Sequence, residues 1–160
     1  MAFHLFVSTL SIDTALGKVD KASMSQETLM ELLISGITNA EILSGSRNSS
    51  TDVAQWRGVT FNADRDITAI HWQATIGKSH LSGFLQLQWL PVTVQTFVLW
   101  GSELSGSLDL TRLPPPLKYL NLSSNRFSGS IDLTSLPAAL ETLVLGENLL
   151  HGPLDMTALN

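Results

Sequence analysis

The chain contains no cysteine. Without thiols it can form no disulfide or thiolate metal site, and it has no thiolate nucleophile. No glycine-rich phosphate-binding loop is present either, because the recurring glycines belong to a repeat. The histidines are scattered, and none has a carboxylate or a second histidine at metal-ligand spacing; they are His4, His71, His80 and His151. The sequence therefore predicts no catalytic residue, no metal site and no cofactor.

Charge is also scarce, since only 14% of the 160 residues are charged and the net charge is −5. An acidic balance argues against binding to nucleic acid or to an anionic membrane surface. No apolar stretch is long enough to span a bilayer. Few charges combined with 44% hydrophobic residues indicate that a partner normally covers part of the surface. We therefore expect a protein partner.

The most informative feature of the sequence is a motif that is repeated at a constant spacing. Copies open at Leu90, Leu113 and Leu136, a spacing of 23 residues (113 − 90 and 136 − 113), and Leu159 opens another. A fixed period of this length predicts a solenoid, in which each unit buries its apolar face against its neighbours. Solenoids present extended surfaces, so the repeat favours a binding function over an enzymatic one.

Each copy has a strand-like first half. The middle copy reads Leu117-x-x-Leu120-x-Leu122-x-x-Asn125-x-Phe127-x-Gly129. Alternation around Leu120 predicts a short strand with leucines facing inward, and successive copies then form a parallel sheet. Asn125 and its counterpart Asn148 are expected to satisfy buried backbone groups at a sharp turn. Ser102 stands at this position in the first copy, where we expect a weaker turn.

The second half of each copy alternates again. This pattern predicts a second short strand on the convex side, at Gly106–Leu110, Gly129–Leu133 and Gly152–Met156. The recurring Leu-Pro pairs remove a backbone donor and disfavour helical conformation in the preceding residue, so long convex helices are not expected.

The pattern LxxLxLxxN resembles the leucine-rich repeat. The recurring "LSG" and "FSG" resemble the plant-type subclass, and the "LDLT-x-LP" finish is similar to repeats of kinetoplastid protozoa. The resemblance implies an α/β solenoid: a short leucine-rich repeat right-handed superhelix with a parallel concave sheet, short convex strands and an N-terminal helical cap.

The residues before Leu90 are expected to form that cap. Ser23–Leu43 reads as one amphipathic helix that buries one apolar face, and Ser23 with Gln26 resembles a capping box. The apolar face consists of Leu29, Leu33, Ile37 and Ala40. Two strand-like runs follow, Trp56–Phe61 and Ile67–Trp72. The expected organisation is an extension (1–22, whose first ten residues pack on the cap as a strand or short helix), a capping region (23–66) and the repeats (67–160: one irregular, three regular, then truncated).

The caps of leucine-rich repeat proteins of the resembled class carry a cysteine pair around the tryptophan that corresponds to Trp56. Phe61 stands where the second cysteine is expected, and Ala54 or Gln55 where the first should be. A cap held by apolar packing instead of a disulfide suits a reducing compartment. The first residues also lack the basic n-region of a signal peptide. We therefore expect an intracellular, cytoplasmic location.

Candidate binding residues face solvent on the concave strands. Trp100 and Tyr119 are expected to be near neighbours one copy apart, and such residues often dominate binding energy. The alternative is that Trp100 only leans on adjacent strands; the other tryptophans, Trp56, Trp72 and Trp89, are expected to pack in the core. The predicted partner-binding residues are Trp100, Tyr119, His71, Val98, Asn121, Lys118, Glu141 and Val144. A second column, Asp109, Asp132 and Asp155, could hold cations but reads better as exposed convex positions.

The last copy has no polar capping segment, and its frame leucines are expected to be partly exposed; they are Leu140, Leu143, Leu145 and Leu150. The chain could be part of a longer protein, associate end to end, or dock its open end on an assembly. The predicted function is a non-catalytic protein–protein interaction module or scaffold that binds through the concave face, the open end or both. The alternatives are a structural subunit of a larger intracellular assembly and a fragment of a surface recognition ectodomain.

Overall fold

The computed structural model describes residues 20–45, 52–73 and 80–155, so the expected packing of the first ten residues lies outside its range. The helical elements are η1 (Lys21–Ser23), α1 (Gln26–Ile34), α2 (Glu41–Ser44), η2 (Val53–Gln55) and η3 (Leu87–Trp89), where η denotes a 3₁₀ helix. A long sheet has the order β1 (Val59–Phe61), β2 (Ile67–Gln73), β4 (Thr96–Trp100), β6 (Tyr119–Asn121) and β8 (Thr142–Val144). A short sheet has the order β3 (Ser82–Phe84), β5 (Glu103–Gly106), β7 (Arg126–Gly129) and β9 (Leu149–Leu150).

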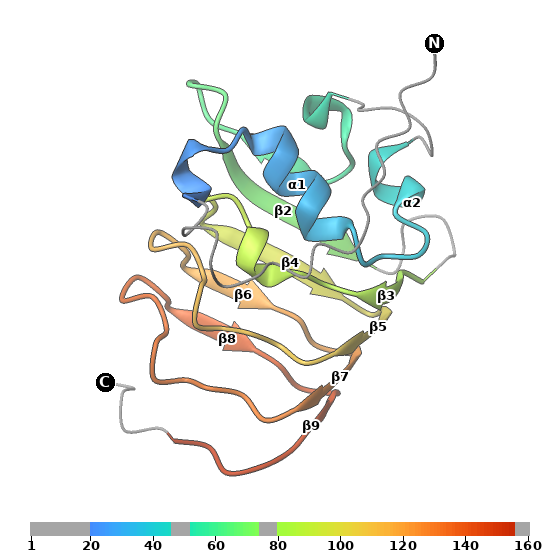
Figure 1. Ribbon diagram of the computed structural model, residues 1–160, viewed down its shortest axis with the longest axis vertical. Helices are drawn as coiled ribbons and strands as arrows, with labels where there is room; N and C mark the ends of the chain where they lie inside the picture. Colours follow the sequence, from blue (N-terminus) through green and yellow to red (C-terminus); the bar gives the residue numbers. More distant parts are fainter. Residues whose placement is uncertain (1–19, 46–51, 74–79, 156–160) are drawn as a thin grey trace.

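The chain winds as a solenoid, and each coil gives one strand to each sheet (Figure 1). We name the three regular repeats the first coil (90–112), the middle coil (113–135) and the last coil (136–158). Strands of successive coils pair in parallel in both sheets. The predicted solenoid with a parallel concave sheet and short convex strands is therefore confirmed.

Inward-facing side chains of the long sheet stack into two layers of the core. Register aligns Ile70 with Phe97, and Phe97 with Leu120, and all three are fully buried. The second layer contains Trp72, whose ring meets that of Phe97 edge to face at 5.8 Å between centroids. The Trp72 indole N–H donates to the Arg57 carbonyl at 2.9 Å, so the buried polar group is satisfied. Trp72 and Trp56 are core residues as predicted, while Trp89 is half-buried.

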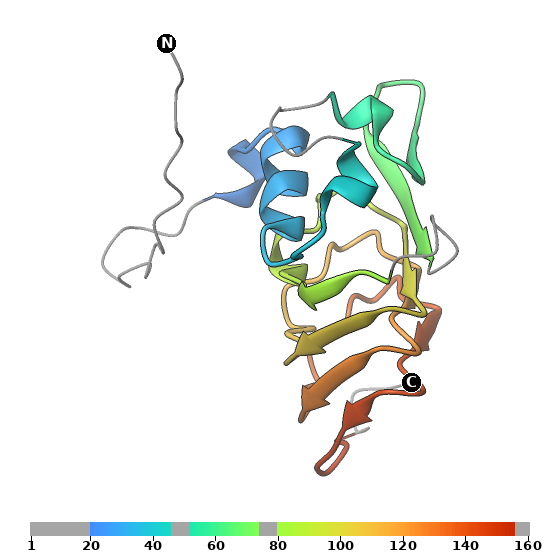
Figure 2. The same cartoon turned by 90° about the vertical axis from the view of Figure 1, so that its right-hand side faces the viewer.

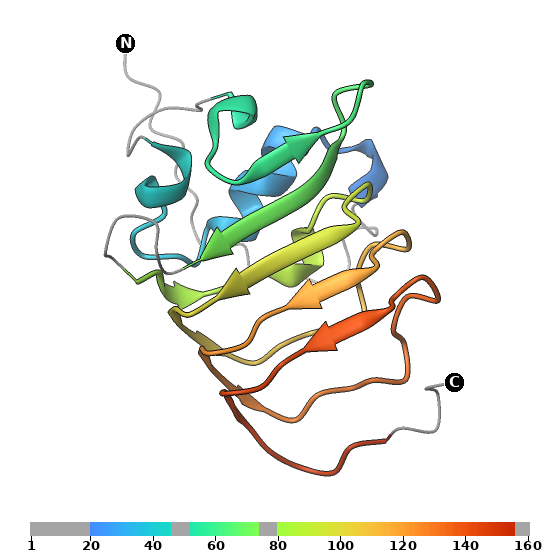
Figure 3. The same cartoon turned by 180° about the vertical axis from the view of Figure 1, so that it is seen from behind.

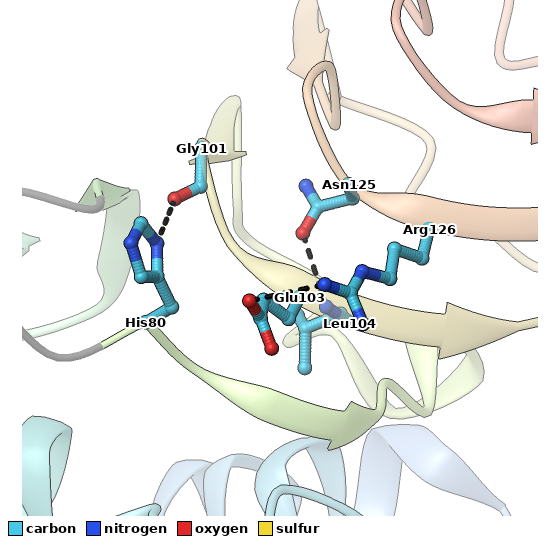
Figure 4. Close-up of polar contacts among 6 residues, drawn as sticks. All are labelled: His80, Gly101, Glu103, Leu104, Asn125 and Arg126. Atoms are coloured by element: carbon cyan, nitrogen blue, oxygen red, sulfur yellow. Dashed lines mark hydrogen bonds and ion pairs between the residues drawn. The ribbon is translucent and has the colours of Figure 1, made fainter.

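Asparagines join neighbouring coils at the turns after β6 and β8. The Asn125 amide donates to the carbonyl of Leu99 at 3.0 Å and to that of Leu122 at 3.2 Å, and its oxygen accepts from Leu104 N at 3.4 Å (Figure 4). Asn148 repeats the arrangement one coil later, accepting from Phe127 N at 3.0 Å. The predicted role of the asparagines in satisfying buried backbone groups is confirmed.

The predicted position of the second strand is wrong. Strands β5 and β7 precede their glycine and end at it, because Gly106 has a φ of 92° that closes the extended conformation. Residues 107–110 have no regular structure, although Leu108 and Leu110 are buried. The alternating pattern there belongs to an irregular segment whose leucines point inward. Asp109, which lies between the two leucines, accepts hydrogen bonds from Thr111.

The single helix predicted over Ser23–Leu43 is also wrong, because α1 ends at Ile34 and α2 begins at Glu41. Residues 36–38 instead pair antiparallel with β3: Phe84 N donates to Gly36 O at 3.0 Å and Thr38 N to Ser82 O at 2.8 Å. A Cβ at Gly36 would lie 2.5 Å from the Phe84 ring, so glycine permits this approach. A contact distant in sequence interrupts the helical pattern.

The predicted capping box is replaced by two separate interactions. Ser25, not Ser23, is the N-cap, and its hydroxyl accepts from Thr28 N at 3.2 Å. The Gln26 side chain leaves the helix to donate to Arg65 O at 3.1 Å and to accept from Ile67 N at 2.6 Å. Gln26 therefore ties α1 to the start of β2.

The two ends of the coil stack differ. At the N-terminal end β1 pairs antiparallel with β2, residues 36–38 pair antiparallel with β3, and α1 lies over the stack (Figure 1 and Figure 2). At the other end, within the described residues, β8 and β9 have no neighbour on their outer side. The four frame leucines of the last coil are only half-buried, as predicted. A capping role for the helices and the boundaries at residues 22 and 66 remain predictions.

Candidate binding face

Figure 3 shows the outer side of the long sheet, whose strands lie next to one another in the order β1, β2, β4, β6 and β8. The parallel register places residues of successive strands in rows that run across the strands. The register defines a tyrosine row of Ala69, Thr96, Tyr119 and Thr142. Next to it lies a valine row of His71, Val98, Asn121 and Val144. A tryptophan row begins with Gln73 and Trp100. The predicted site residues of the strands therefore share one face.

This face is open in the part of the chain that the structure describes, since no described segment lies in front of it (Figure 3). Side chains of the three rows are exposed or half-buried, whereas the alternating residues Phe97, Leu99 and Leu120 are fully buried. Trp100 is 38% exposed. The rest of its surface is covered, so it both leans on the sheet and offers an aromatic surface to solvent.

The expectation that Trp100 and Tyr119 are near neighbours is wrong. Tyr119 aligns with Thr96, four residues before Trp100 on β4. At roughly 3.3 Å per residue, they lie on adjacent strands but about 13 Å apart along them. The two aromatic residues therefore stand on opposite sides of the valine row.

The predicted charged residues lie at the margin of the face. Lys118 and Glu141 are exposed and precede β6 and β8, where Glu141 N donates to Lys118 O at 2.8 Å. The three rows themselves contain no Asp, Glu, Lys or Arg. The centre of the face therefore has no carboxylate, ammonium or guanidinium group.

Asn121 has a fixed orientation. Ser123 N donates to Asn121 Oδ1 at 3.0 Å, and the Ser123 hydroxyl donates to the same oxygen at 2.6 Å. A backbone N–H can only donate, so the oxygen must face Ser123 and the Nδ2 group must face away from it. Ser123 lies two residues after Asn121, beyond the end of β6, and is not among the predicted partner-binding residues.

The opposite side of each coil carries the aspartates that the sequence singles out. Asp109 and Asp132 each accept from the backbone and hydroxyl of a threonine two residues later. The threonine hydroxyl is the largest cause that lowers the pKa of both carboxyl groups. Residues 20–45, 52–73 and 80–155 contain no group of three or more potential metal ligands. Each aspartate therefore stabilises its own turn.

One further absence concerns membranes. Among the helices of the described residues, none combines the length and apolar character needed to cross a bilayer.

No protein-family model matches the chain, and a search of curated proteins finds no match. Solved structures do resemble it. The PEPR1–AtPEP1 structure is 22% identical with a TM-score of 0.65, over 82% of this chain and 19% of that one. The structure of a pollen receptor kinase 3 is 30% identical with a TM-score of 0.60, over 78% of this chain and 60% of that one. A plant ice-binding protein is 20% identical with a TM-score of 0.50, over 78% and 48%.

The predicted cytoplasmic location is contradicted by these comparisons, because the similar structures include plant receptor ectodomains, which are extracellular. The error lies in the use made of the missing cysteines. Val53 and Trp56 are buried, and the Trp72 indole bonds to Arg57 O, so apolar packing and one hydrogen bond hold this region. Such packing works in any redox environment. The fold is that of leucine-rich repeat ectodomains, of which the chain spans 19% and 60% in the first two cases.

Proposed function

We propose that this chain is the recognition part of a surface ectodomain and binds a peptide or protein partner through the outer face of its long sheet. Two findings support this. The fold is shared with PEPR1–AtPEP1 and with a receptor kinase. The sheet face is open and holds a partly exposed tryptophan among neutral side chains. Cap helices and repeats then form one rigid support for that face.

The observation that carries the proposal is Trp100, the last residue of β4, which is 38% exposed on the outer face of the long sheet. Its neighbours in sequence, Leu99 and Gly101, belong to the buried layer and to the turn, so the ring is held on a rigid element. A rigid aromatic residue on an ordered surface loses little entropy on binding, which is why tryptophan is enriched among residues that dominate interfaces.

The test is selection of binders from a random-peptide display library on the immobilised full chain. Selected peptides are then measured against the wild type, Trp100→Ala and Phe84→Ala. Phe84 is the matched control, because it is an aromatic residue 52% exposed on β3 of the short sheet. We expect Trp100→Ala to weaken binding about 30-fold, the size of a hot-spot loss, and Phe84→Ala to change it less than about twofold. Equal losses in both variants, or no selected peptide at all, would contradict the proposal.

A second candidate function is docking through the open end of the stack. An apolar groove of about 310 Å³ lies there. Its lining comes from the middle and last coils and includes Ile131, Leu133, Leu143, Leu145, Leu150 and Leu154. Leu154 of this lining is 57% exposed, and Leu149, next to Leu150 in the sequence, is 63% exposed.

The exposed pair allows a test that spares the core. Leu149→Glu with Leu154→Glu should leave the unfolding midpoint nearly unchanged, because both side chains already contact water. If this end docks a partner, the double variant should sediment in extracts as a smaller particle than the wild type, while Trp100→Ala should sediment like the wild type. The reverse pattern would support the sheet face alone.

A further inference from the structure

We infer that the valine row binds an uncharged, proline-rich segment in the polyproline II conformation, which lies across strands β2 to β8. This inference rests on the proposed function, because it names the chemistry of the partner for the same face. It follows from the spacing, the hydrogen-bonding groups and the charge of the row.

The spacing of the valines is the first argument. Val98 and Val144 stand in one row on β4 and β8, with one strand between them. Neighbouring strands lie about 4.8 Å apart, so the two valines are about 9.6 Å apart. A polyproline II helix rises about 3.1 Å per residue with three residues per turn, so side chains at i and i+3 recur every 9.3 Å or so. In a bound β-strand, side chains on the same face recur about every 6.7 Å, which does not match the distance between the two valines.

The hydrogen-bonding groups are the second argument. Asn121 lies between the two valines, and its oxygen is held by Ser123. Within the described residues its Nδ2 group has no hydrogen-bond acceptor, so it presents free donors at the surface of the row. A polyproline II backbone makes no internal hydrogen bonds and leaves its carbonyls available, and proline has no N–H that would need an acceptor. A row centre that only donates suits such a backbone.

The flanks and the charge complete the match. Tyr119 stands on one side of the valine row and Trp100 on the other, so the row is bordered by aromatic rings of adjacent strands. Aromatic-lined grooves are the common means of docking proline-rich segments. Because the three rows lack Asp, Glu, Lys and Arg, a charged segment that lies along them would lose hydration, and only Lys118 and Glu141 at the margin of the face could pair with it. The valines favour apolar side chains over the hydroxyls of a glycan.

The probe is a capped peptide of repeated Pro-Pro-Val units, which places valine at every third position. Its isomer of identical composition has the valines adjacent, and a third peptide carries Lys or Glu in place of valine. We expect the repeated peptide to bind the full chain about 10-fold more tightly than either, by fluorescence anisotropy or calorimetry, as expected for about two lost apolar contacts. Affinity should change less than about twofold between roughly 50 and 500 mM salt, because no charge pairs are involved.

Asn121→Asp is the decisive variant. The aspartate keeps an oxygen for Ser123 N and the Ser123 hydroxyl but removes the outward donor, so binding of the repeated peptide should fall about 10-fold or more while the unfolding midpoint stays close to wild type. Phe84→Ala serves again as the unaffected control. Unchanged binding in Asn121→Asp, or equal affinity for the peptide isomers, would overturn the inference.

Failure of the inference and failure of the proposed function give different results. If the display library yields peptides that need Trp100 but are charged or β-prone, the face recognises another peptide class and the polyproline II assignment is wrong. If neither library nor designed peptides bind, and a set of neutral oligosaccharides binds in a Trp100-dependent manner, the peptide-binding function itself is wrong.

Discussion

The middle coil and the last coil have the same frame but different surroundings. Leu117, Leu120 and Leu122 of the middle coil are fully buried. Their counterparts Leu140, Leu143 and Leu145 in the last coil are only half-buried. Because the local sequence is nearly the same, the difference comes from the neighbours alone. A coil of this type acquires its core only when it is covered on both sides.

The same comparison applies to hydrogen bonds. Asn125 of the middle coil is buried, and its amide and oxygen together bridge the first and middle coils. Asn148 makes the equivalent bonds but is half-buried. An identical set of bonds is worth more where water cannot replace a lost partner. We therefore expect stability to decline from the middle coil toward the last.

The largest difference is expected for leucine truncation. Leu120→Ala should lower the free energy of unfolding by about 4 kcal/mol, because the fully covered site cannot collapse around the cavity. Leu143→Ala removes the same atoms from a half-exposed site and should cost about 1–2 kcal/mol. Urea unfolding followed by circular dichroism measures both. Equal losses would mean that the last coil is covered in solution.

Asparagine replacement should show a smaller difference. Asn125→Ala leaves the Leu104 amide and the Leu99 and Leu122 carbonyls without their side-chain partner, and we expect a loss of about 3 kcal/mol. Asn148→Ala should cost less, about 1 kcal/mol, since Asn148 is half-buried and water can enter the space that its side chain leaves. The same unfolding measurement applies, with hydrogen exchange at Leu104 and Phe127 as a local readout. A larger loss for Asn148 would contradict the gradient.

The periodic part of the chain was predictable because its structure depends on neighbours with the same sequence. The spacing of 23 residues fixes the parallel sheet, the role of Asn125 and the half-exposure of the last coil. The period also aligns Trp100 with Ser123 and Tyr119 with Thr96 (a difference of 23 in each case, 123 − 100 and 119 − 96), so the offset of the two aromatic residues was available from the sequence.

The remaining differences arise where contacts are distant or where a pattern has several causes. The helix break at Gly36 depends on pairing with β3, which no local propensity reports. The alternation after Gly106 reflects buried leucines in an irregular segment. The orientation of Asn121 requires knowing that Ser123 donates to its oxygen. The missing cysteines had no single physical meaning, so the compartment could not be derived from them.

The closed N-terminal end offers a third contrast with the last coil. Gly83 has a φ of 106°, and a Cβ there would lie 2.2 Å from the Gly36 carbonyl oxygen. Gly83→Ala should therefore break the pairing of residues 36–38 with β3 and lower stability by about 2 kcal/mol. Gly146→Ala in the last coil is the control, because nothing lies within 4 Å of its added Cβ. Increased exchange at Thr38 and Phe84 in Gly83→Ala alone would support the closure.

The smallest effect is a pH dependence that compares the threonine-bonded aspartates of the first and middle coils. Hydrogen bonds from Thr111 and Thr134 hold the pKa of Asp109 and Asp132 below the ordinary value of 3.8. A carboxyl group with a lowered pKa in the folded state stabilises the fold above its unfolded pKa, and this contribution is lost as the pH falls through the folded pKa. The contribution of these two aspartates to stability should therefore be constant above about pH 5 and decline below about pH 4.

Replacing the hydroxyl donors isolates this contribution. Thr111→Val with Thr134→Val keeps both carboxylates but removes the O–H donors, so the pKa of each aspartate should rise toward 3.8. The decline of the unfolding midpoint below about pH 4 should then be shallower than in the wild type. Carbon-detected NMR titration of the Asp109 and Asp132 carboxyl groups gives the direct readout. The control is Asn148→Ala, which should lower stability without changing the titration midpoint of either aspartate. If the titration midpoints of Asp109 and Asp132 are unchanged in the double valine variant, the threonine hydroxyls do not stabilise the charged aspartates. The recurrence of these threonines from coil to coil would then reflect turn geometry alone.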